Sequence, residues 1–170
     1  MAVLSQLDPF DLLEAQFVRG APVTHLALFA DWRAMRCAWI ASYILTTGRD
    51  GRRPFAVLAV GHTGQAGVAQ AAFLARDHVR HRLAIGRAAV LIRDGLPPFM
   101  DAHGIARIEA RCWADHPTAP GFLTRVGFKF EARLPGFGGA LASTTFLQFA
   151  LVAPIPAAAA ANPEETLKCA

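Results

Sequence analysis

Residues 104–128 read GIARIEARCWADHPTAPGFLTRVGF, and this part of the 170-residue chain predicts a strand followed closely by a helix. Between Ile105 and Trp113 every second residue is charged and the residues between them are small or apolar: Arg107, Glu109 and Arg111 alternate with Ile108, Ala110 and Cys112. Alternation with a period of two is typical of a strand that has one face against a core. We therefore expect a strand over 105–113.

The second half of this stretch predicts the helix. Pro117 opens it, and the apolar residues follow at the spacing i, i+3, i+4 and i+7, which places them on one helical face: Ala119, Phe122, Leu123 and Val126. Gly127 ends the helix, because glycine readily adopts the left-handed backbone that closes helices.

Two further helices are expected near the N-terminus. Asp8 and Pro9 form a good helix start, because aspartate caps free amides and proline at the first helical position gives up only an amide that would be unpaired. The first helix is expected over 9–18, and a second, which Thr24 can cap, over 24–35. A short first strand is also expected over Ala2–Gln6.

Three strands are expected next, over 39–45, 55–60 and 68–75, because these segments are rich in aromatic, β-branched and aliphatic residues. The sequence GRDG over 48–51 supplies the positive φ angles of a hairpin turn. The three strands therefore form an antiparallel meander.

A long apolar face then predicts a helix from Leu83, with Pro97 and Pro98 ending it early, since proline removes a helical hydrogen bond. Strands over 128–134 and 144–152 complete the pattern. The expected fold class is α/β (α+β), with a mixed, mostly antiparallel sheet and helices on both of its faces. We expect one domain over 1–153 and a flexible tail over 154–170.

The composition excludes several classes of protein. The chain is 54% hydrophobic and 18% charged, unlike a disordered chain, and its apolar runs fall far short of the roughly 20 residues that cross a bilayer. The N-terminus lacks the pattern of a secretory signal. We therefore expect a cytoplasmic protein, or a virion protein if a phage encodes it, with no membrane partner.

The net charge of +4 suits an anionic ligand such as a nucleotide phosphate. It is small for a dedicated nucleic-acid-binding protein, so no nucleic-acid partner is expected, and the chain is expected to be a monomer or a homodimer. The three cysteines, Cys37, Cys112 and Cys169, have no CxxC spacing and are expected to be reduced.

Residues 104–128 resemble the second half of GNAT acyltransferases, in which a strand leads into N-x-x-A, a short helix and a closing Gly-Phe. Ala119 and the pair Gly127-Phe128 fall at the family spacing, with His116 in place of the usual Asn. The sequence HRLAIGR over 81–87 is similar to the family's phosphate signature Q/R-x-x-G-x-G/A before a helix. The compact layout also resembles the internal virion proteins of some tailed phages.

The resemblance implies that the chain binds acetyl-CoA as a co-substrate. The family binds the pyrophosphate through backbone amides and a helix N-terminus, where small residues let the backbone approach the phosphates; here this assigns His81, Arg82, Leu83, Ala84, Ile85, Gly86 and Arg87. A backbone amide among Phe73, Leu74 and Ala75 is expected to polarise the thioester carbonyl. His116, at the Asn position, completes the expected cofactor site.

Acyl transfer to an amine needs a base, because an ammonium group must lose a proton before it attacks a thioester. Glu109 is the candidate base, and Tyr43 and Asp77 are further candidate catalytic residues, with His78 beside Asp77. Each has an ordinary alternative: Glu109 pairs with Arg107 or Arg111, Tyr43 is a half-buried strand aromatic, Asp77 is a cap and His78 is solvated. Where most tyrosine-bearing relatives place a tyrosine acid, this chain has Leu123.

No metal site is predicted. His78 and His81 lie three residues apart and can share a helical face, but no cysteine or second carboxylate nearby completes a ligand set. Cys112 lies on the apolar side of its strand and is expected to be an inert buried thiol.

Two functions are open from the sequence. The leading hypothesis is an N-acetyltransferase that moves an acetyl group directly from acetyl-CoA to a small-molecule or peptide amine. The alternative is a GNAT-fold structural or binding protein, such as a phage internal virion protein, which the departures at His81, Ala84, His116 and Leu123 favour. In acyl-CoA-binding members the strands corresponding to 68–75 and 105–113 diverge to admit the pantetheine, so their spacing separates the two hypotheses.

Overall fold

A computed structural model describes residues 2–48, 51, 53–138 and 144–154. The elements follow in the order η1 (Leu4–Gln6), α1 (Pro9–Arg19), α2 (His25–Ala34), η2 (Met35–Ala38), β1 (Trp39–Thr47), β2 (Arg53–His62), β3 (Val68–Ala75), α3 (His78–Ala102), β4 (Arg107–Trp113), α4 (Ala119–Val126), β5 (Lys129–Leu134) and β6 (Phe146–Val152). The predicted tail lies outside the described residues, apart from Pro154 at its start.

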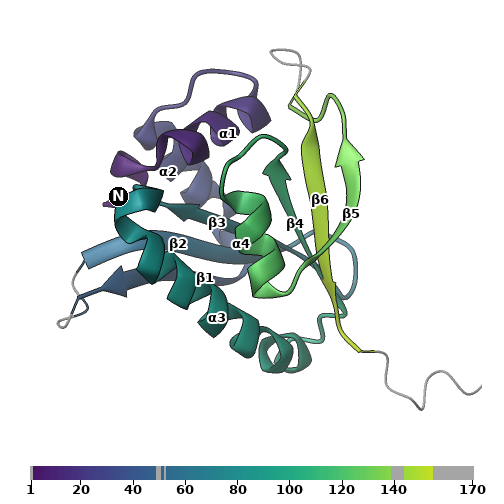
Figure 1. Cartoon of the computed structure of the whole chain (residues 1–170). Helices are drawn as coiled ribbons and strands as arrows, with labels where there is room; N and C mark the ends of the chain where they lie inside the picture. The colour runs from purple at the N-terminus through teal and green to yellow at the C-terminus, as the bar shows by residue number, and fades with distance from the viewer. Residues whose placement is uncertain (1, 49–50, 52, 139–143, 155–170) are drawn as a thin grey trace, which may run out of the picture.

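The six strands form one sheet in the order β1-β2-β3-β4-β6-β5 (Figure 1). β3 and β4 pair in parallel, and the other four neighbouring pairs are antiparallel. Helix α3 makes the crossover between β3 and β4. The predicted fold class, a mixed and mostly antiparallel sheet, is confirmed.

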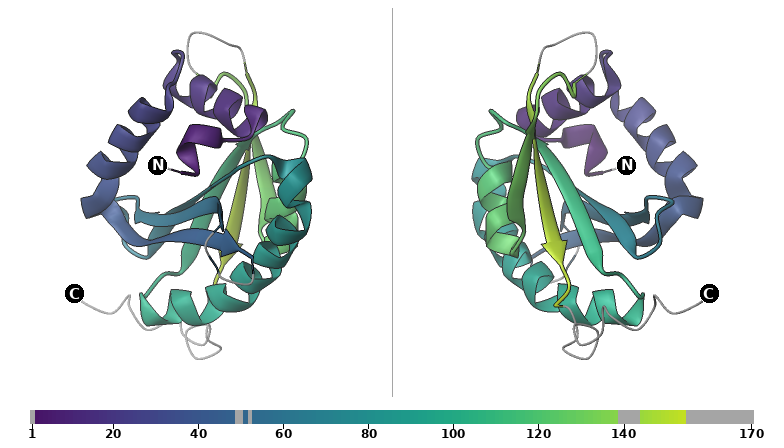
Figure 2. Two further views of the ribbon diagram at one scale, coloured as in Figure 1. Left: turned by 90° about the vertical axis from the view of Figure 1, so that its left-hand side faces the viewer. Right: turned by 90° about the vertical axis from the view of Figure 1, so that its right-hand side faces the viewer.

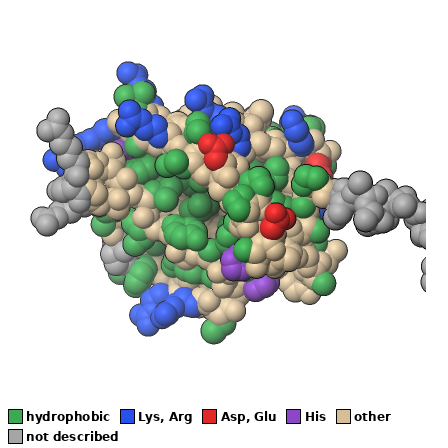
Figure 3. All heavy atoms as spheres, turned by 90° about the horizontal axis from the view of Figure 1, so that it is seen from below, with side chains coloured by type: hydrophobic (Ala, Val, Ile, Leu, Met, Phe, Trp, Pro, Cys, Tyr) green, Lys and Arg blue, Asp and Glu red, His purple; other side chains and the backbone are tan. Residues whose placement is uncertain are grey.

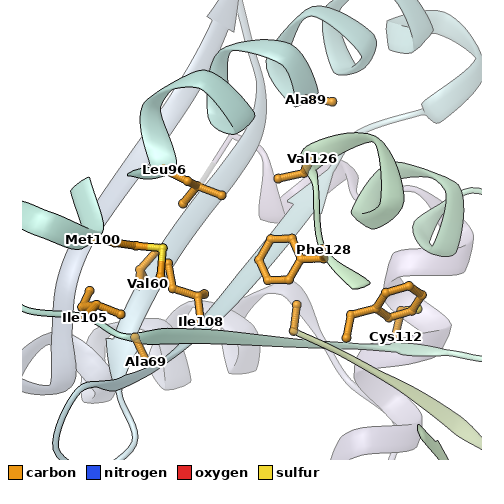
Figure 4. Close-up of a cluster of buried hydrophobic side chains, with 12 residues drawn as sticks. Val60, Ala69, Ala89, Leu96, Met100, Ile105, Ile108, Cys112, Val126 and Phe128 are labelled. Atoms are coloured by element: carbon orange, nitrogen blue, oxygen red, sulfur yellow. The ribbon is translucent and has the colours of Figure 1, made fainter. Parts of the chain in front are cut away.

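Helices cover both faces of the sheet, as Figure 2 shows for α2 and α3. On one face, side chains of α3 and α4 pack against Ile108 of β4, and Met100 and Val126 are each only 2% exposed (Figure 4). On the other face, Leu28 and Trp32 of α2 pack around Val57 of β2. The sheet is therefore the central layer of the molecule.

The caps predicted for the first two helices are confirmed. The Asp8 side chain accepts a hydrogen bond of 3.0 Å from the amide of Phe10, and the Thr24 hydroxyl accepts one of 3.2 Å from the amide of Ala27. The predicted short strand over 2–6 is wrong. Residues 4–6 form a 3-10 turn, and the nearest strand-like contact is an isolated bridge between Leu7 and Arg76.

Helix α3 is longer at both ends than predicted. It begins at His78 because two carboxylates accept hydrogen bonds from amides of its first turn. Asp8 accepts one of 2.8 Å from the His78 amide, and Asp77 accepts one of 2.9 Å from the Arg80 amide. It also runs through Pro97 and Pro98 to residue 102. The missing proline amides deprive only two carbonyls of partners, and burial of apolar side chains on the last turns outweighs that loss.

Helix α4 begins at Ala119, two residues after the predicted start at Pro117. The hairpin between β1 and β2 has positive φ angles at Gly48 and Gly51, as predicted, while residues 49, 50 and 52 lie outside the described part. Within the described residues, none of the helices combines the length and the hydrophobicity that a membrane span needs.

Candidate functional site

The parallel strands β3 and β4 pair over only three residues each. Val68, Ala69 and Gln70 lie opposite Arg107, Ile108 and Glu109, and beyond these positions the two strands no longer pair. The strand ends are β3 from Ala71 to Ala75 and β4 from Ala110 to Trp113. They leave a gap in the sheet. The backbone amides that face this gap need other hydrogen-bond partners, since buried amides are almost always hydrogen-bonded.

Helix α1 supplies two of these partners and spans the gap (Figure 1). The Asp11 carboxylate accepts a hydrogen bond of 2.6 Å from the amide of Ala75 on β3. One turn later, the Glu14 carboxylate accepts one of 2.8 Å from the amide of Trp113 on β4. Two side chains of one helix thus bind the two separated strand ends.

Asp11 also holds two imidazoles. Its Oδ1 lies 3.1 Å from Nε2 of His78 and 3.1 Å from Nε2 of His116. Nδ1 of His78 lies 2.9 Å from the Thr118 hydroxyl. Asp11 and His116 are buried, and the His78 side chain is 13% exposed.

Electrostatics in this cluster favour an ion pair. Burial alone would raise the pKa of Asp11, but hydrogen bonds from His116 and His78 outweigh it, so the pKa lies below its ordinary value. Burial alone would lower the pKa of His78, but the hydrogen bond and charge of Asp11 hold it above its ordinary value. Asp8 and Asp77 add to this effect.

The cluster does not suit a metal ion, although ligand atoms of Asp11, His78 and His116 lie within 4.8 Å of one another. Nδ1 of His116 accepts hydrogen bonds from the amides of Thr118 and Ala119, at 3.2 and 3.0 Å. An accepting nitrogen carries no proton, so the imidazole proton is on Nε2 and is donated to Asp11. A metal at Nε2 would need that proton moved to Nδ1, against two amide donors.

His116 therefore has a structural part in the site. By accepting from the amides of Thr118 and Ala119 it caps α4, in the way that serine or aspartate caps other helices. This contact explains why α4 begins after Thr118 and not at Pro117.

A first cavity of about 350 Å³ follows the gap on the side of α3 and α4. Its walls include the rings of Phe73 and Phe122, which stack with centroids 4.4 Å apart. Three arginines, Arg82, Arg111 and Arg125, also line it. An elongated ligand with an apolar arm and an anionic end matches these walls.

A second cavity of about 520 Å³ lies on the side of α1 and α2. It is lined by apolar and aromatic side chains of α2, β1 and β2, and by the charged residues Arg19 and Asp31. Glu14 and Leu74 line both cavities, so the two cavities meet at the gap. Burial raises the pKa of Glu14 to about 7.

Several of the predicted cofactor residues line the first cavity: Phe73, Leu74, Arg82, Ile85, Gly86 and His116. The expected phosphate loop before the helix is wrong, because His81, Leu83, Ala84 and Arg87 lie inside α3, which begins at His78. Ala75 is also not available as the polarising amide, because it donates to Asp11.

None of the three predicted catalytic residues lines either cavity. The Glu109 carboxylate lies between Arg107 at 2.8 Å and Arg111 at 3.2 Å, which is its predicted alternative. Tyr43 is 52% exposed on the edge strand β1. Asp77 is exposed and caps α3, whereas His78, expected in solvent, belongs to the buried cluster.

Sequence reasoning missed Asp11 and Glu14. The available signal was their spacing: two carboxylates three residues apart share a helical face, and here the helix reads PFDLLEAQFVR, with apolar residues around both. A carboxylate pair flanked by apolar residues on a helix is a candidate for buried contacts.

Cys112 is buried as predicted, and burial, followed by the charge of Glu14, raises its pKa to about 12. Its thiol is therefore inert at neutral pH.

No family model matches the sequence, and no curated protein matches it. Solved structures do match its fold. A GNAT-family acetyltransferase from Bacillus anthracis superposes with a TM-score of 0.66 at 10% identity, over 89% of this chain and 87% of that chain. For yncA from Salmonella typhimurium, solved with its cofactor acetyl-CoA, the TM-score is 0.60 at 9% identity, over 87% of this chain and 88% of that chain.

A ribosomal-protein-alanine N-acetyltransferase from Brucella melitensis gives a TM-score of 0.58 at 11% identity, over 84% of this chain and 91% of that chain. At identities this low, the likeness is one of fold.

Proposed function

Because the chain has the GNAT acyltransferase fold, we propose that it is an N-acetyltransferase, which transfers an acetyl group directly from acetyl-CoA to an amine. The observation that carries the proposal is the gap between β3 and β4, with the first cavity along it. A closed, fully paired β3–β4 ladder would leave no room for pantetheine. Here the pairing ends after Gln70 and Glu109.

Phe73 offers the amide that polarises the thioester carbonyl. Arg76 directs its amide to Phe55 of β2, and Ala75 directs its amide to Asp11 in the gap. Successive residues of a strand point their amides to opposite edges, so the amide of Phe73 faces the gap like that of Ala75. A donor aimed at the carbonyl oxygen would stabilise the charge that develops there during attack.

Arginine side chains hold the phosphates in this proposal. The N-terminus of α3, which binds phosphates in many nucleotide sites, already carries the carboxylates of Asp8 and Asp77. These carboxylates would repel a pyrophosphate. Arg82 and Arg125, both exposed at the first cavity, supply the positive charge instead.

Calorimetry with acetyl-CoA tests the proposal. We expect the wild type to bind acetyl-CoA, and Arg82→Ala to bind it at least about tenfold more weakly, the loss expected for a charge-assisted hydrogen bond. Arg133→Ala is the matched control, because Arg133 is exposed on β5 and does not line the first cavity. Failure of the wild type to bind acetyl-CoA would reject the proposal.

A binding role without catalysis is the second candidate, and one observation favours it. α3 exposes large apolar side chains, with Val79 at 79% and Leu83 and Leu91 at 73% each. Hydrophobic side chains gather near the middle of the face seen from below, with arginine and lysine around its edge (Figure 3). Absence of acetyl-CoA binding together with self-association or partner binding that Leu83→Ser abolishes would favour this candidate.

A further inference from the structure

We propose that the second cavity binds the acceptor, a primary amine on an apolar or aromatic body, and that Glu14 removes a proton from its ammonium group. The inference rests on the acetyl transfer proposed above and names a base and a class of acceptor for it.

The position of Glu14 is the first argument. Glu14 and Leu74 line both cavities, and of these two residues only Glu14 can exchange a proton. If acetyl-CoA occupies the first cavity and the acceptor the second, the two reactants meet at the gap, beside this carboxylate. A base must lie within hydrogen-bond reach of the proton that it removes.

The orientation of the carboxylate is fixed by the sheet. Oε2 of Glu14 accepts a hydrogen bond of 2.8 Å from the amide of Trp113, at the end of β4. A carboxylate has a second oxygen, which can accept a proton from a ligand. The hydrogen bond therefore holds Glu14 at the gap without using up its capacity as a base.

Its surroundings make Glu14 a base of suitable strength. Burial, the largest effect, raises its pKa to about 7, so both protonation states are populated at neutral pH. The groups that face it from neighbouring elements are Asp11 on α1, His116 before α4, Arg111 and Cys112 on β4, and, across the second cavity, Arg19, Asp31 and His62.

The walls of the second cavity indicate the acceptor. The rings of Trp32 and Trp39 meet edge to face with centroids 4.3 Å apart, and Leu28 and Met35 add apolar surface. Tryptophan faces attract ammonium groups and apolar bodies alike.

The acidic groups limit the number of ammonium groups that the cavity accepts. Asp31 is already paired with Arg19 at 2.8 Å, whereas Glu14 forms no ion pair within the described residues. One available carboxylate suits one ammonium group, so a monoamine fits this cavity better than a polyamine.

The reaction balances as follows. The ammonium group gives one proton to Glu14, and the neutral nitrogen attacks the thioester carbonyl carbon. The carbon–sulfur bond breaks, and the nitrogen loses a second proton, which neutralises the departing thiolate. Glu14 then releases its proton to solvent, so the products are the amide, the CoA thiol and one proton.

A thiol-release assay with phenethylamine, hexylamine and spermidine tests the acceptor and the base together. We expect kcat/KM at least about tenfold higher for phenethylamine than for spermidine. Glu14→Gln is expected to lower kcat/KM for phenethylamine by about 10²-fold, the usual cost of losing a general base. The rise of kcat/KM with a midpoint near pH 7 should disappear in this variant, because Gln does not titrate.

The Gln side chain can still accept from the Trp113 amide, so acetyl-CoA affinity in Glu14→Gln should stay within about threefold of the wild type. Glu131→Gln, which changes an exposed carboxylate on β5, is the matched control and should leave kcat/KM unchanged. Glu14→Asp keeps a titrating carboxylate and should retain the pH-dependent rise at a lower rate.

The outcomes distinguish failure of this inference from failure of the proposed acetyl transfer. Acetylation of phenethylamine with the rate and the pH-dependent rise intact in Glu14→Gln would overturn the base while leaving the acetyltransferase in place. A preference for spermidine over both monoamines would overturn the acceptor class. If the wild type binds acetyl-CoA in calorimetry but acetylates none of the amines, this inference is rejected while the proposed acetyl transfer keeps its own test. If the wild type does not bind acetyl-CoA, both are rejected.

Discussion

Asp11 accepts a hydrogen bond of 2.6 Å from the backbone amide of Ala75, although the two residues lie 64 positions apart in the chain. The same carboxylate contacts two buried or half-buried imidazoles through its other oxygen. Helix α1 is therefore fastened to the end of β3 at the place where the sheet opens. In the proposed mechanism this leaves the amide of Phe73 as the donor to the thioester carbonyl.

Removal of the Asp11 carboxylate should destabilise the fold. Asp11→Ala would leave the buried Ala75 amide and the His116 proton without acceptors, and we expect a loss of about 3 kcal/mol in the free energy of unfolding. Asp94→Ala removes an exposed carboxylate paired with Arg93 and should change it by less than about 1 kcal/mol. Urea unfolding followed by circular dichroism measures both, and equal losses would contradict the role given to Asp11.

The ion pair between Asp11 and His78 should make stability depend on pH in two ranges. The pKa of Asp11 is lowered from 3.8, so its contribution is present above pH 3.8 and is lost as the pH falls through the lower folded value. The pKa of His78 is raised from 6.5, so its contribution is complete below pH 6.5 and is lost as the pH rises through the folded value.

His78→Gln removes the pair and tests this expectation. The wild type should exceed the variant in unfolding free energy most between pH 3.8 and 6.5, and the difference should shrink on both sides. Urea unfolding at pH 3, 5 and 8 covers the three ranges. A difference that grows from pH 5 to pH 8 would show that a neutral hydrogen bond, and not the ion pair, stabilises this contact.

Glu14→Gln should stabilise the protein in alkaline solution. The folded protein raises the pKa of Glu14 from 4.5 to about 7, so the stability that this group gives is present below pH 4.5 and is lost as the pH rises through about 7. At about 1.4 kcal/mol for each pH unit, the variant should gain about 3 kcal/mol on the wild type between pH 4 and pH 8.

This gain is measured without any substrate, by urea unfolding of both proteins across the pH range. Equal pH dependence of the wild type and Glu14→Gln would mean that the Glu14 carboxylate titrates as in an unfolded chain. Ionised Glu14 lowers the stability of the fold, yet it lies between the two cavities. Active sites often contain residues that lower stability in this way because function requires them.

Gly86 provides a matched pair of variants for the cofactor site. It lines the first cavity from within α3, and a Cβ atom there would meet no atom within 4 Å apart from its chain neighbours and the adjacent backbone of its own helix. Gly86→Ala should therefore stabilise α3 by about 0.5–1 kcal/mol and leave acetyl-CoA binding within about threefold. Gly86→Glu would bring a negative charge to the cavity wall and should weaken binding at least about tenfold. Similar affinities of the two variants for acetyl-CoA would place the phosphates elsewhere.

The elements that the sequence predicted correctly are those with a local signal. The alternation of charged and apolar residues over 105–113 defines β4, and Asp8 and Thr24 mark two helix starts by chemistry that acts within three residues. The start of α3 was missed because its first turn carries polar residues, and its caps include Asp8, a residue 70 positions away.

The candidate site was harder to predict because its contacts are long-range. Glu14 reaches the amide of Trp113 over 99 positions, and Asp11 reaches His116 over 105. No periodicity in the sequence brings these residues together. Glu109 was predicted as a base from its place on β4, but the arginines two positions before and after it on the same face already pair with it.

The last prediction separates the two candidate bases. Glu109 forms ion pairs with Arg107 and Arg111 and does not line either cavity, so Glu109→Gln should leave kcat/KM within about threefold of the wild type. Tyr43→Phe should be equally mild, because Tyr43 is exposed on β1, separated from the gap by β2 and β3. Glu14→Gln should cost about 10²-fold in the same assay. Acetyl-CoA affinity is measured for all three variants as the control. A large loss of activity in Glu109→Gln, with Glu14→Gln still active, would show that Glu109 on β4 is the base. A large loss in Tyr43→Phe would show that the acceptor binds along the edge of the sheet at β1.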